Sequence, residues 1–501
     1  MKHITTKLLV FLMALTVAFV SCEGPEGQVG QQGDKGDKGD QGNPGADGEN
    51  YPTDVVLQDY STTPALVKKL SGFESLEVFS LISSEDKLIG APSFTFGGSA
   101  DGSGLLKATD GYMLLVNHED NFAVSRITLD KTFKPVGGEY ILNSDGGQWR
   151  LCSATLATME EHGFGPLYIT CGESSVESRT HALSPFAGAG SASMSREIAG
   201  FGRWNAENAV PLPKTAYAGK TVVLIGDDDS GGTAGGQVAM YMSDEVGDLD
   251  NGKLYVLRRT DLNEREMDFE EDATATNVEF VEIEDHTTQT GAQINSAVAA
   301  LNGIAFGRVE DIDYRKDGVG REVYFNVTGQ DGNTDRTKYG RTYKLVLDAA
   351  DPLKGTLQLI LDGDNRTTGK AKAFQNVDNI VVTENYLYVQ EDPNGYTTET
   401  HDSYIYQYDL ATKALKPVFE LDHHRTDDLG SKFMSTNSAF GSWEYGSMVD
   451  ISDIVGIEDV FMLCVQVHTW RKPEFAGVDG GALRAAEDQG SQILIVKGLG
   501  R

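Results

Sequence analysis

The sequence predicts an all-β protein whose body is a six-bladed β-propeller with short insertions. Short apolar or alternating runs such as TVVLIG, RTYKLVL and VFMLCVQVH recur from Tyr51 to Arg501, and Gly, Asp and Asn separate them. Many short strands with regular turns are typical of all-β domains. Six of the runs end in a carboxylate, and each interval between these ends is long enough for one four-stranded blade. The last run, Gln492 to Gly498, is expected to pair with Leu76 to Ile82 and so remove two sheet edges. The best helix candidate is the stretch 294–306.

The six acid-terminated runs predict a metal site. Counted from the first acid, the steps are 54, 54, 83, 81 and 53 residues. The innermost strand of each propeller blade lines the central channel, so these acids are expected to converge there. Converging carboxylates repel one another unless cations lie between them, and oxygen ligands suit Ca²⁺. The alternative is that the acids lie in ordinary surface turns. The acids are Glu119, Glu173, Asp227 to Asp229 (with Asp228 at the centre), Glu310 with Asp311, Glu391 with Asp392, and Glu444.

The N-terminus has the pattern of a lipoprotein signal peptide. Lys2 and Lys7 precede an apolar stretch, Leu8 to Val20, which is too short for a comfortable membrane span. The stretch ends at Ser21-Cys22 and resembles a bacterial lipobox, which implies a signal peptide at 1–21, cleavage before Cys22 and lipidation of its thiol. The alternative is an ordinary signal peptide with a chance cysteine. Lipid at Cys22 would anchor the protein in the bacterial cell envelope, at the outer membrane or cell surface.

A collagen-like segment follows within residues 22–50. From Gly24 to Asn50 glycine recurs at every third position, which gives nine Gly-X-Y triplets. Period-three glycine is the requirement of the collagen triple helix, although Pro25 and Pro44 are the only prolines in the segment. Two interpretations stay open: a homotrimeric stalk and a monomeric hydrophilic tether. Either one holds the body, residues 51–501, away from the membrane.

The charge of the chain limits the classes of molecule that it can bind, and its cysteine content limits the disulfides that it can form. The formal net charge is −33, from 42 basic and 75 acidic residues. This excludes binding to nucleic acid backbones and to anionic lipid, which need Lys and Arg. The body has three cysteines, an odd number that cannot form a complete set of disulfides. Cys464 lies in an apolar run and is expected to be a buried thiol, while His423-His424 is interpreted as an exposed pair in an acidic loop.

The order of the motifs resembles the PhoX-type alkaline phosphatases. The resemblance covers nearly all of residues 75–500. It implies a six-bladed β-propeller with calcium and ferric iron in a central site, which hydrolyses phosphate monoesters outside the cytoplasm. The matching motifs are, in order, GYMLLVNHED, LCSATLAT followed by TCGE, VVLIGDDD, GGQVAMYMSDEVGDLDNGKLYVL, FGRVEDIDY with VYFNVTG, FQNVDNIVV with LYVQEDPNG, and WEYGSMVDIS with VQVH.

The resemblance also implies roles for individual residues. Cys152 matches a cysteine that ligates iron, while the alternatives for it are a disulfide with Cys171 and a plain core thiol. Arg308 and Glu310 match the arginine and acid of a catalytic motif, and an arginine fork fits phosphate bidentately. The acids that match metal ligands are Glu119, Glu173, Glu310, Asp378, Glu391 and Glu444.

Three departures from the family pattern concern the substrate side of the site. Gly172 stands where the family has the first acid of its C-E-E motif, and ATLATMEEHG replaces a Thr-Pro-Trp-Gly stretch. Asn376-Val377 replaces an arginine-proline pair, so a phosphate-binding arginine is missing. Two functions are therefore expected to compete. One is a metal-dependent phosphoesterase with weak activity on small phosphorylated substrates, and the other is a calcium-stabilised propeller that acts as a surface binding module.

Overall fold

The computed structural model describes residues 53–231, 234–427, 429–433 and 438–501. The described residues, from 53 onward, belong to one compact unit. The predicted signal peptide, Cys22 and the Gly-X-Y segment lie outside the described residues. Among the described residues, no helix is both long enough and apolar enough to cross a membrane.

The body is an all-β structure, as predicted. Within the described ranges the strands form five antiparallel sheets. The first contains, from one edge to the other, β3 (Ala100–Ala108), β4 (Gly111–His118), β5 (Ala123–Asp130) and β6 (Pro135–Leu142). The second contains, in the same sense, β7 (Leu151–Ala157), β8 (Leu167–Gly172) and β9 (His181–Leu183). The third contains β10 (Ala206–Pro211), β11 (Thr221–Asp227), β12 (Gln237–Ser243), β13 (Lys253–Arg259), β14 (Thr276–Ile283), β18 (Lys354–Asp362), β17 (Arg341–Leu347), β16 (Glu322–Val327) and β15 (Val309–Tyr314).

The two remaining sheets come from the C-terminal part of the body and add strands from its N-terminal part. One contains β1 (Val67–Lys69), β22 (Leu415–Leu421), β21 (Tyr404–Asp409), β20 (Tyr386–Glu391) and β19 (Val377–Val382). The other contains β2 (Glu77–Ser83), β25 (Gln489–Lys497), β24 (Val460–Arg471) and β23 (Glu444–Asp450). The short helices are α1 (Ser144–Gly147), α2 (Gly291–Ala300), α3 (Gly430–Phe433), α4 (Ser452–Val455), η1 (Ala189–Ser191), η2 (Glu266–Asp268) and η3 (Pro473–Phe475).

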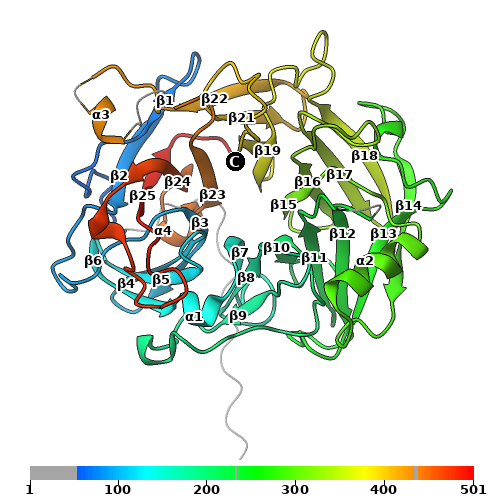
Figure 1. The fold of residues 1–501 in the computed structure, drawn as a ribbon, viewed down its shortest axis with the longest axis horizontal. Helices are drawn as coiled ribbons and strands as arrows, with labels where there is room; N and C mark the ends of the chain where they lie inside the picture. Colours follow the sequence, from blue (N-terminus) through cyan, green and yellow to red (C-terminus); the bar gives the residue numbers. More distant parts are fainter. Residues whose placement is uncertain (1–52, 232–233, 428, 434–437) are drawn as a thin grey trace, which may run out of the picture. The chain divides into compact units, whose positions relative to one another are not determined.

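The sheets are arranged around a centre in the manner of a propeller (Figure 1). The strands β3, β7, β10, β15, β19 and β23 each pack against the next, and β23 packs against β3, so these strands form a closed ring. We call them the inner strands. The remaining strands of each sheet follow outward from them in antiparallel pairs. This arrangement places the start of every inner strand around one common axis.

The prediction of six separate blades is wrong in the region from β10 to β18. There the outer strands β14 and β18 pair, with Thr276 to Glu279 opposite Lys354 to Leu357, and this joins two strand sets into the nine-stranded sheet. The end strands of that sheet, β10 and β15, also lie side by side, so the sheet nearly closes on itself. The pairing buries Val278 and Leu357 in a shared apolar cluster. The body therefore has four separate sheets and one nearly closed sheet.

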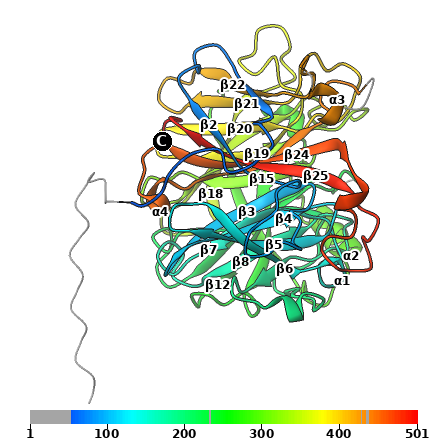
Figure 2. The same cartoon turned by 90° about the vertical axis from the view of Figure 1, so that its left-hand side faces the viewer.

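The predicted pairing of the two ends of the body is confirmed. Glu77 to Ser83 of β2 pair with Gln492 to Lys497 of β25, which lies between β2 and β24 (Figure 2). Both edges of β25 are therefore paired, and its apolar residues are buried. The predicted helix is α2, which a capping box starts: the Thr290 hydroxyl accepts from the Gln293 amide, and the Gln293 side chain accepts from the Thr290 amide.

Candidate metal centre

Each inner strand carries a β-bulge near its start. The pairing register against the neighbouring strand shifts between Ala100 and Ser103, Leu151 and Ala154, Ala206 and Asn208, Val309 and Ile312, Val377 and Ile380, and Tyr445 and Met448. A bulge leaves residues out of the ladder and re-aims their side chains. Asp101, Cys152, Glu207, Glu310 and Asp378 all lie inside these shifts. The repeated bulge is therefore the local device that presents these side chains together at one end of the ring.

These side chains form one connected cluster, which we call the channel cluster. The cluster consists of three groups of side chains, and within each group the ligand atoms all lie within 4.8 Å of one another. Cys152 belongs to two of the groups and Glu207 also belongs to two, so the groups share members. The groups are Asp101 with Cys152 and Glu207, Glu119 with Cys152 and Glu173, and Glu207 with Glu310 and Asp378. The structure thus brings together Glu119, Cys152, Glu173, Glu310 and Asp378 of the residues selected from the sequence.

Asp228 and Glu444 lie next to this cluster. The Nε atom of Arg308 lies 2.8 Å from Asp228 Oδ1, and Nη2 of the same guanidinium lies 3.4 Å from Glu310. Burial, followed by the charges of Asp392 and Glu119, raises the pKa of Glu444 well above its ordinary value. Both predicted acids therefore border the channel cluster.

Glu391 faces away from the cluster, in contrast to its predicted role. Its oxygens accept hydrogen bonds from the amides of Gln375 (2.8 Å) and Tyr404 (2.9 Å) and from the Tyr406 hydroxyl (3.1 Å). His401 Nε2 lies 3.0 Å from the same carboxylate, whose side chain is fully buried. The next residue, Asp392, follows the end of β20, and its carboxyl group is the one that approaches Glu444.

Asp101 and Glu207 are members that sequence reasoning missed. Each stands at the second position of an inner strand, in SADGSG and NAENAV, with no apolar run before it. The selected pattern, an apolar run followed by an acid, finds Glu119 and Glu173 at the ends of second strands and Glu310 in an inner strand, but it does not find an inner-strand acid that no apolar run precedes. A recurrent acid opposite such an end, in the preceding strand, is the signal that could have found them.

Cys152 is a free cysteine in contact with an acid. Cys152, Cys171 and Cys464 are all free and buried, so the alternative of a Cys152–Cys171 disulfide is wrong. The Cys152 thiol donates to Glu173 Oε2 at 3.1 Å. Burial, followed by the charges of Glu119 and Glu173, raises the pKa of this thiol well above its ordinary value.

Burial and mutual repulsion dominate the electrostatics of the cluster. Burial raises the pKa of Glu207 to about 8, although the Ser153 hydroxyl at 2.8 Å lowers it. Burial and neighbouring acids also raise the pKa values of Asp101, Glu173, Glu310 and Asp378 well above their ordinary range. The Oδ1 atoms of Asp101 and Asp378 are buried without a hydrogen-bond partner. Such a set is stable as anions only when cations compensate it. Its oxygens fit Ca²⁺, and its thiol fits an ion that accepts thiolate, such as Fe³⁺.

Two arginines flank the cluster. Arg308 has a left-handed backbone (φ 72°), and its Nη1 donates to Asn394 at 2.6 Å while Nε and Nη2 hold Asp228. Arg150 was not selected from the sequence; its Nε lies 3.1 Å from Glu119 Oε1, and its Nη1 lies 3.9 Å from Glu173 Oε2. Its side chain is 44% exposed, so its guanidinium is accessible to a ligand.

Asn376 does not supply the function of the arginine that the resemblance implies at this position. It has a left-handed backbone (φ 68°), and its side-chain amide donates to the carbonyls of Thr328 (2.8 Å) and Lys338 (2.9 Å). Both donors are thus used within the protein framework, while Arg150 and Arg308 lie beside the channel cluster.

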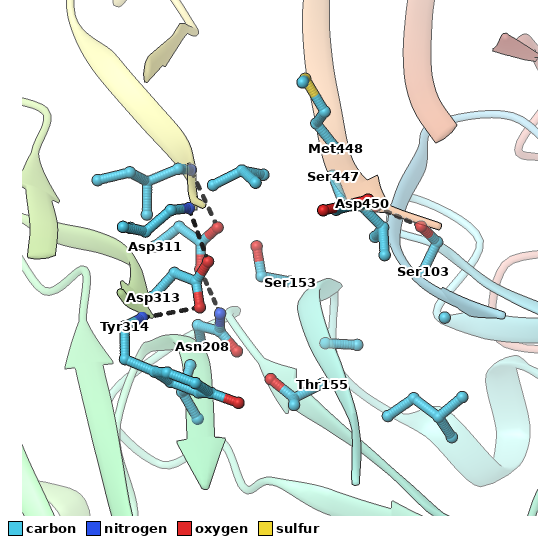
Figure 3. A pocket seen from close by; sticks show the side chains of 18 of the residues that line it. Ser103, Ser153, Thr155, Asn208, Asp311, Asp313, Tyr314, Ser447, Met448 and Asp450 are labelled. Carbon is cyan, nitrogen blue, oxygen red and sulfur yellow. Dashed lines mark hydrogen bonds between the residues drawn. The ribbon is translucent and has the colours of Figure 1, made fainter. Parts of the chain in front are cut away.

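Two cavities adjoin the cluster. One, of about 450 Å³, is lined by Arg308, Asp228, Ser174, Gln330 and Tyr396 among others, so it opens beside the arginine. The second, of about 230 Å³, lies farther along the inner strands (Figure 3). Its lining includes Ser153, Asn208, Asp311 and Asp313, and Asp311 Oδ2 accepts from the Ile380 amide at 3.1 Å. The Ser153 hydroxyl, which lines this second cavity, also donates to Glu207 of the channel cluster.

Comparison with known proteins shows the fold. No family model matches the chain, and no curated protein does. Pseudomonas fluorescens PhoX, solved in complex with vanadate, a transition-state analogue, matches with a TM-score of 0.56 at 14% identity, over 88% of this chain and 98% of that one. An α-L-arabinofuranosidase of Fusarium graminearum matches at 10% identity and a TM-score of 0.36, over 81% and 96% of the two chains. A β-1,3-galactosidase bound to galactodeoxynojirimycin matches at 11% identity and a TM-score of 0.35, over 82% and 94%. At 14% identity the first likeness establishes a shared fold, and the function must be argued from the site.

Proposed function

We propose that the protein is a metal-dependent phosphoesterase that hydrolyses phosphate monoesters outside the cytoplasm. The observation that carries the proposal is the channel cluster itself: buried carboxylates and one thiol converge within hydrogen-bonding range of two arginines, next to a cavity of about 450 Å³. The shared fold with a protein solved in complex with vanadate supports the same function.

The cluster divides into two kinds of metal ligand. Asp101, Glu207, Glu310 and Asp378 would hold Ca²⁺ through oxygen alone, with Asp228 and Glu444 at the border. Cys152 with Glu119 and Glu173 would hold Fe³⁺, because this group contains the thiol. When bound, such ions neutralise the phosphoryl oxygens and activate an oxygen nucleophile. Glu391 is not part of this proposal, because protein donors occupy its oxygens.

The arginines would bind and orient the phosphoryl group. A guanidinium has a planar fork that matches two phosphate oxygens, and Asp228 and Asn394 fix the orientation of Arg308 beside the cavity. Arg150 approaches from the side of Glu119 and Glu173. Because Asn376 provides no positive charge, Arg150 would be the second phosphate-binding arginine. Glu310 forms an ion pair with Arg308 and is a metal ligand in the same proposal, so its loss would disturb both functions.

The test is hydrolysis of a chromogenic phosphate monoester at alkaline pH with added calcium. We expect turnover by the wild type, a loss of at least about 100-fold in Glu310→Gln and Cys152→Ala, and no change in the exposed control Lys131→Gln. Elemental analysis of the same samples reports calcium and iron. A fully metallated wild type that turns over no phosphate monoester or diester would contradict the proposal.

The second candidate is a calcium-stabilised binding module. It is favoured by Asn376 in place of an arginine and by the ion pair that already engages Arg308 with Asp228. Calcium without iron, together with an inactive wild type, would support this function.

We also propose that the mature protein is a lipoprotein of the bacterial cell envelope, anchored at Cys22 and held off the membrane by the Gly-X-Y segment. Cys22→Ser should move the protein from the membrane fraction to the soluble fraction. Sedimentation of the chain with and without residues 24–50 distinguishes the homotrimeric stalk from the monomeric tether. Retention of Cys22→Ser in membranes would contradict the anchor.

A further inference from the structure

A second group of metal-binding side chains lies outside the channel cluster. Asp402, His423 and His424 offer ligand atoms that all lie within 4.8 Å of one another, and they share no residue with the channel cluster. Asp402 precedes β21, and the histidines follow β22, so all three lie in the segments that flank two neighbouring strands of the five-stranded sheet. The sequence prediction of an exposed histidine pair is wrong, because His423 is fully buried.

Both imidazole rings direct Nδ1 at the same carboxylate. His424 Nδ1 lies 2.7 Å from Asp402 Oδ2, and His423 Nδ1 lies 3.3 Å from Asp402 Oδ1. The other nitrogen of each ring is held by Ser438: His424 Nε2 lies 3.2 Å from the carbonyl oxygen, and His423 Nε2 lies 2.7 Å from the hydroxyl. Metal-ligating histidines have this arrangement, in which the second nitrogen is fixed by a neighbouring polar group.

The contacts of His424 leave Nδ1 as the ring atom that faces the carboxylate. Its Nε2 lies 3.2 Å from the Ser438 carbonyl, which only accepts hydrogen bonds, and its Nδ1 lies 2.7 Å from Asp402 Oδ2. A metal ion at this place would take the Nδ1 lone pair and the carboxylate oxygen as ligands, whereas without an ion a proton on Nδ1 joins the two.

Packing fixes the rings in this orientation. Trp443 stacks on His423 with 4.8 Å between ring centroids, and Phe440 packs on His424 at the same distance. The Ser403 hydroxyl donates to the Trp443 carbonyl at 2.7 Å. The His424 side chain is 33% exposed, so an ion can reach the site from solvent and keep a water at its open position.

We infer that Asp402, His423 and His424 form a binding site for a divalent late first-row transition metal, with Zn²⁺ as the fitting representative. Two imidazoles and one carboxylate suit such ions better than Ca²⁺, whose preferred ligands are oxygen alone. The bound ion ties the segment after β22 to the start of β21 and, through Trp443, to the strand that begins at Glu444. The site is independent of the proposed phosphoesterase function.

The experiment uses the full chain, stripped with chelator, saturated with calcium and titrated with Zn²⁺. We expect one equivalent of tightly bound zinc, and its X-ray absorption spectrum should show only nitrogen and oxygen neighbours at about 2.0–2.2 Å. His424→Ala should weaken this binding at least about 100-fold, and Asp402→Asn should weaken it as well. Cys152→Ser, which removes the thiol of the channel cluster, should still bind one equivalent of zinc.

The spectrum of the wild type decides the question even if a variant fails to fold. Sulfur at about 2.3 Å would assign the zinc to Cys152 and overturn the proposal. Full zinc binding by a folded His424→Ala, or no zinc binding by the wild type, would overturn it too, and the cation between His424 and Asp402 would then be a proton.

Discussion

At the scale of single residues, the neighbours Glu391 and Asp392 have opposite functions. Glu391 is fully buried and accepts hydrogen bonds from two backbone amides and the Tyr406 hydroxyl, while Asp392 approaches Glu444. The last residue of β20 is thus a framework carboxylate, and the residue directly after the strand is a candidate ligand.

Exchange of these two acids for amides should separate stability from metal binding. Glu391→Gln replaces an accepting oxygen with an amide that faces donors, so we expect a loss of about 2 kcal/mol in the free energy of unfolding with unchanged calcium content. Asp392→Asn should lower calcium affinity and leave the metal-free protein as stable as the wild type. Denaturant melts and calcium titrations check both variants. Loss of calcium in a folded Glu391→Gln would contradict this assignment.

Arg150 is the second residue whose role is open to test. If it binds the phosphoryl group, Arg150→Gln should reduce kcat/KM about 10- to 100-fold, because one charge-assisted interaction with the transition state is lost. Steady-state kinetics measure the effect, and Lys253→Gln, which removes an exposed partner of Glu282, is the matched control. An Arg150→Gln variant with normal metal content and wild-type kcat/KM would exclude the role.

At the scale of elements, β25 joins the N-terminal strand β2 to the C-terminal strands of the body. It pairs with β24 on one side and β2 on the other, so one strand satisfies two sheet edges. Removal of residues 489–501 should therefore abolish cooperative folding, because β2 and β24 lose their partner and Leu494 and Val496 leave the core. Removal of only Gly500 and Arg501 should leave a folded protein. Near-UV circular dichroism and thermal melts check both truncations, and a cooperative melt of the longer deletion would refute the closure argument.

The bulges of the inner strands are a second feature at this scale, because they decide which side chains reach the channel cluster. In a regular ladder the side chains of Asp101 and Glu207 would follow the strict alternation of the strand. The register shift at each of these residues directs its side chain toward the channel cluster instead. The same device recurs at Cys152, Glu310 and Asp378, so the site depends on a repeated irregularity of the strands.

At the scale of the whole molecule, metal content and pH should control stability together. Burial raises the pKa of Glu207 to about 8 and those of Asp311 and Glu266 to about 7, all above the ordinary carboxyl values. Each of these groups binds its proton more tightly in the metal-free folded state than in the unfolded state. Their contribution to stability is therefore fully present below the unfolded pKa values, 3.8 for Asp and 4.5 for Glu, and declines as pH rises to about 8. Ca²⁺ bound at the proposed centre would replace the proton of Glu207, while Asp311 and Glu266 lie outside the channel cluster.

Chelation should accordingly lower the melting temperature by several degrees at pH 8 and by less at pH 5. A ligand that binds only the native state at 100 times its Kd contributes about 2.7 kcal/mol, which sets the scale of the effect. Thermal melts with EDTA, and with EDTA followed by excess calcium, measure it at both pH values. Equal melting temperatures with and without metal at pH 8 would contradict the metal centre.

The sequence by itself determined the class of the fold and part of the cluster. Apolar runs with turn residues between them encode strands locally, and an acid after such a run, as at Glu119, Glu173 and Glu310, is visible without any long-range information. The pairing of the C-terminal run with Leu76 to Ile82 was also predictable, since a ring of sheets needs its edges closed.

Only the tertiary structure decided which side chains meet. Asp101 and Glu207 follow no apolar run, so their membership depends on bulges and on the packing of inner strands from different sheets. The joining of β14 to β18, and the convergence of Asp402 with His423 and His424, likewise depend on contacts between segments far apart in the chain. Local sequence fixes the direction of a strand and the alternation of its side chains, but distances across the ring follow from the packing of the sheets against one another.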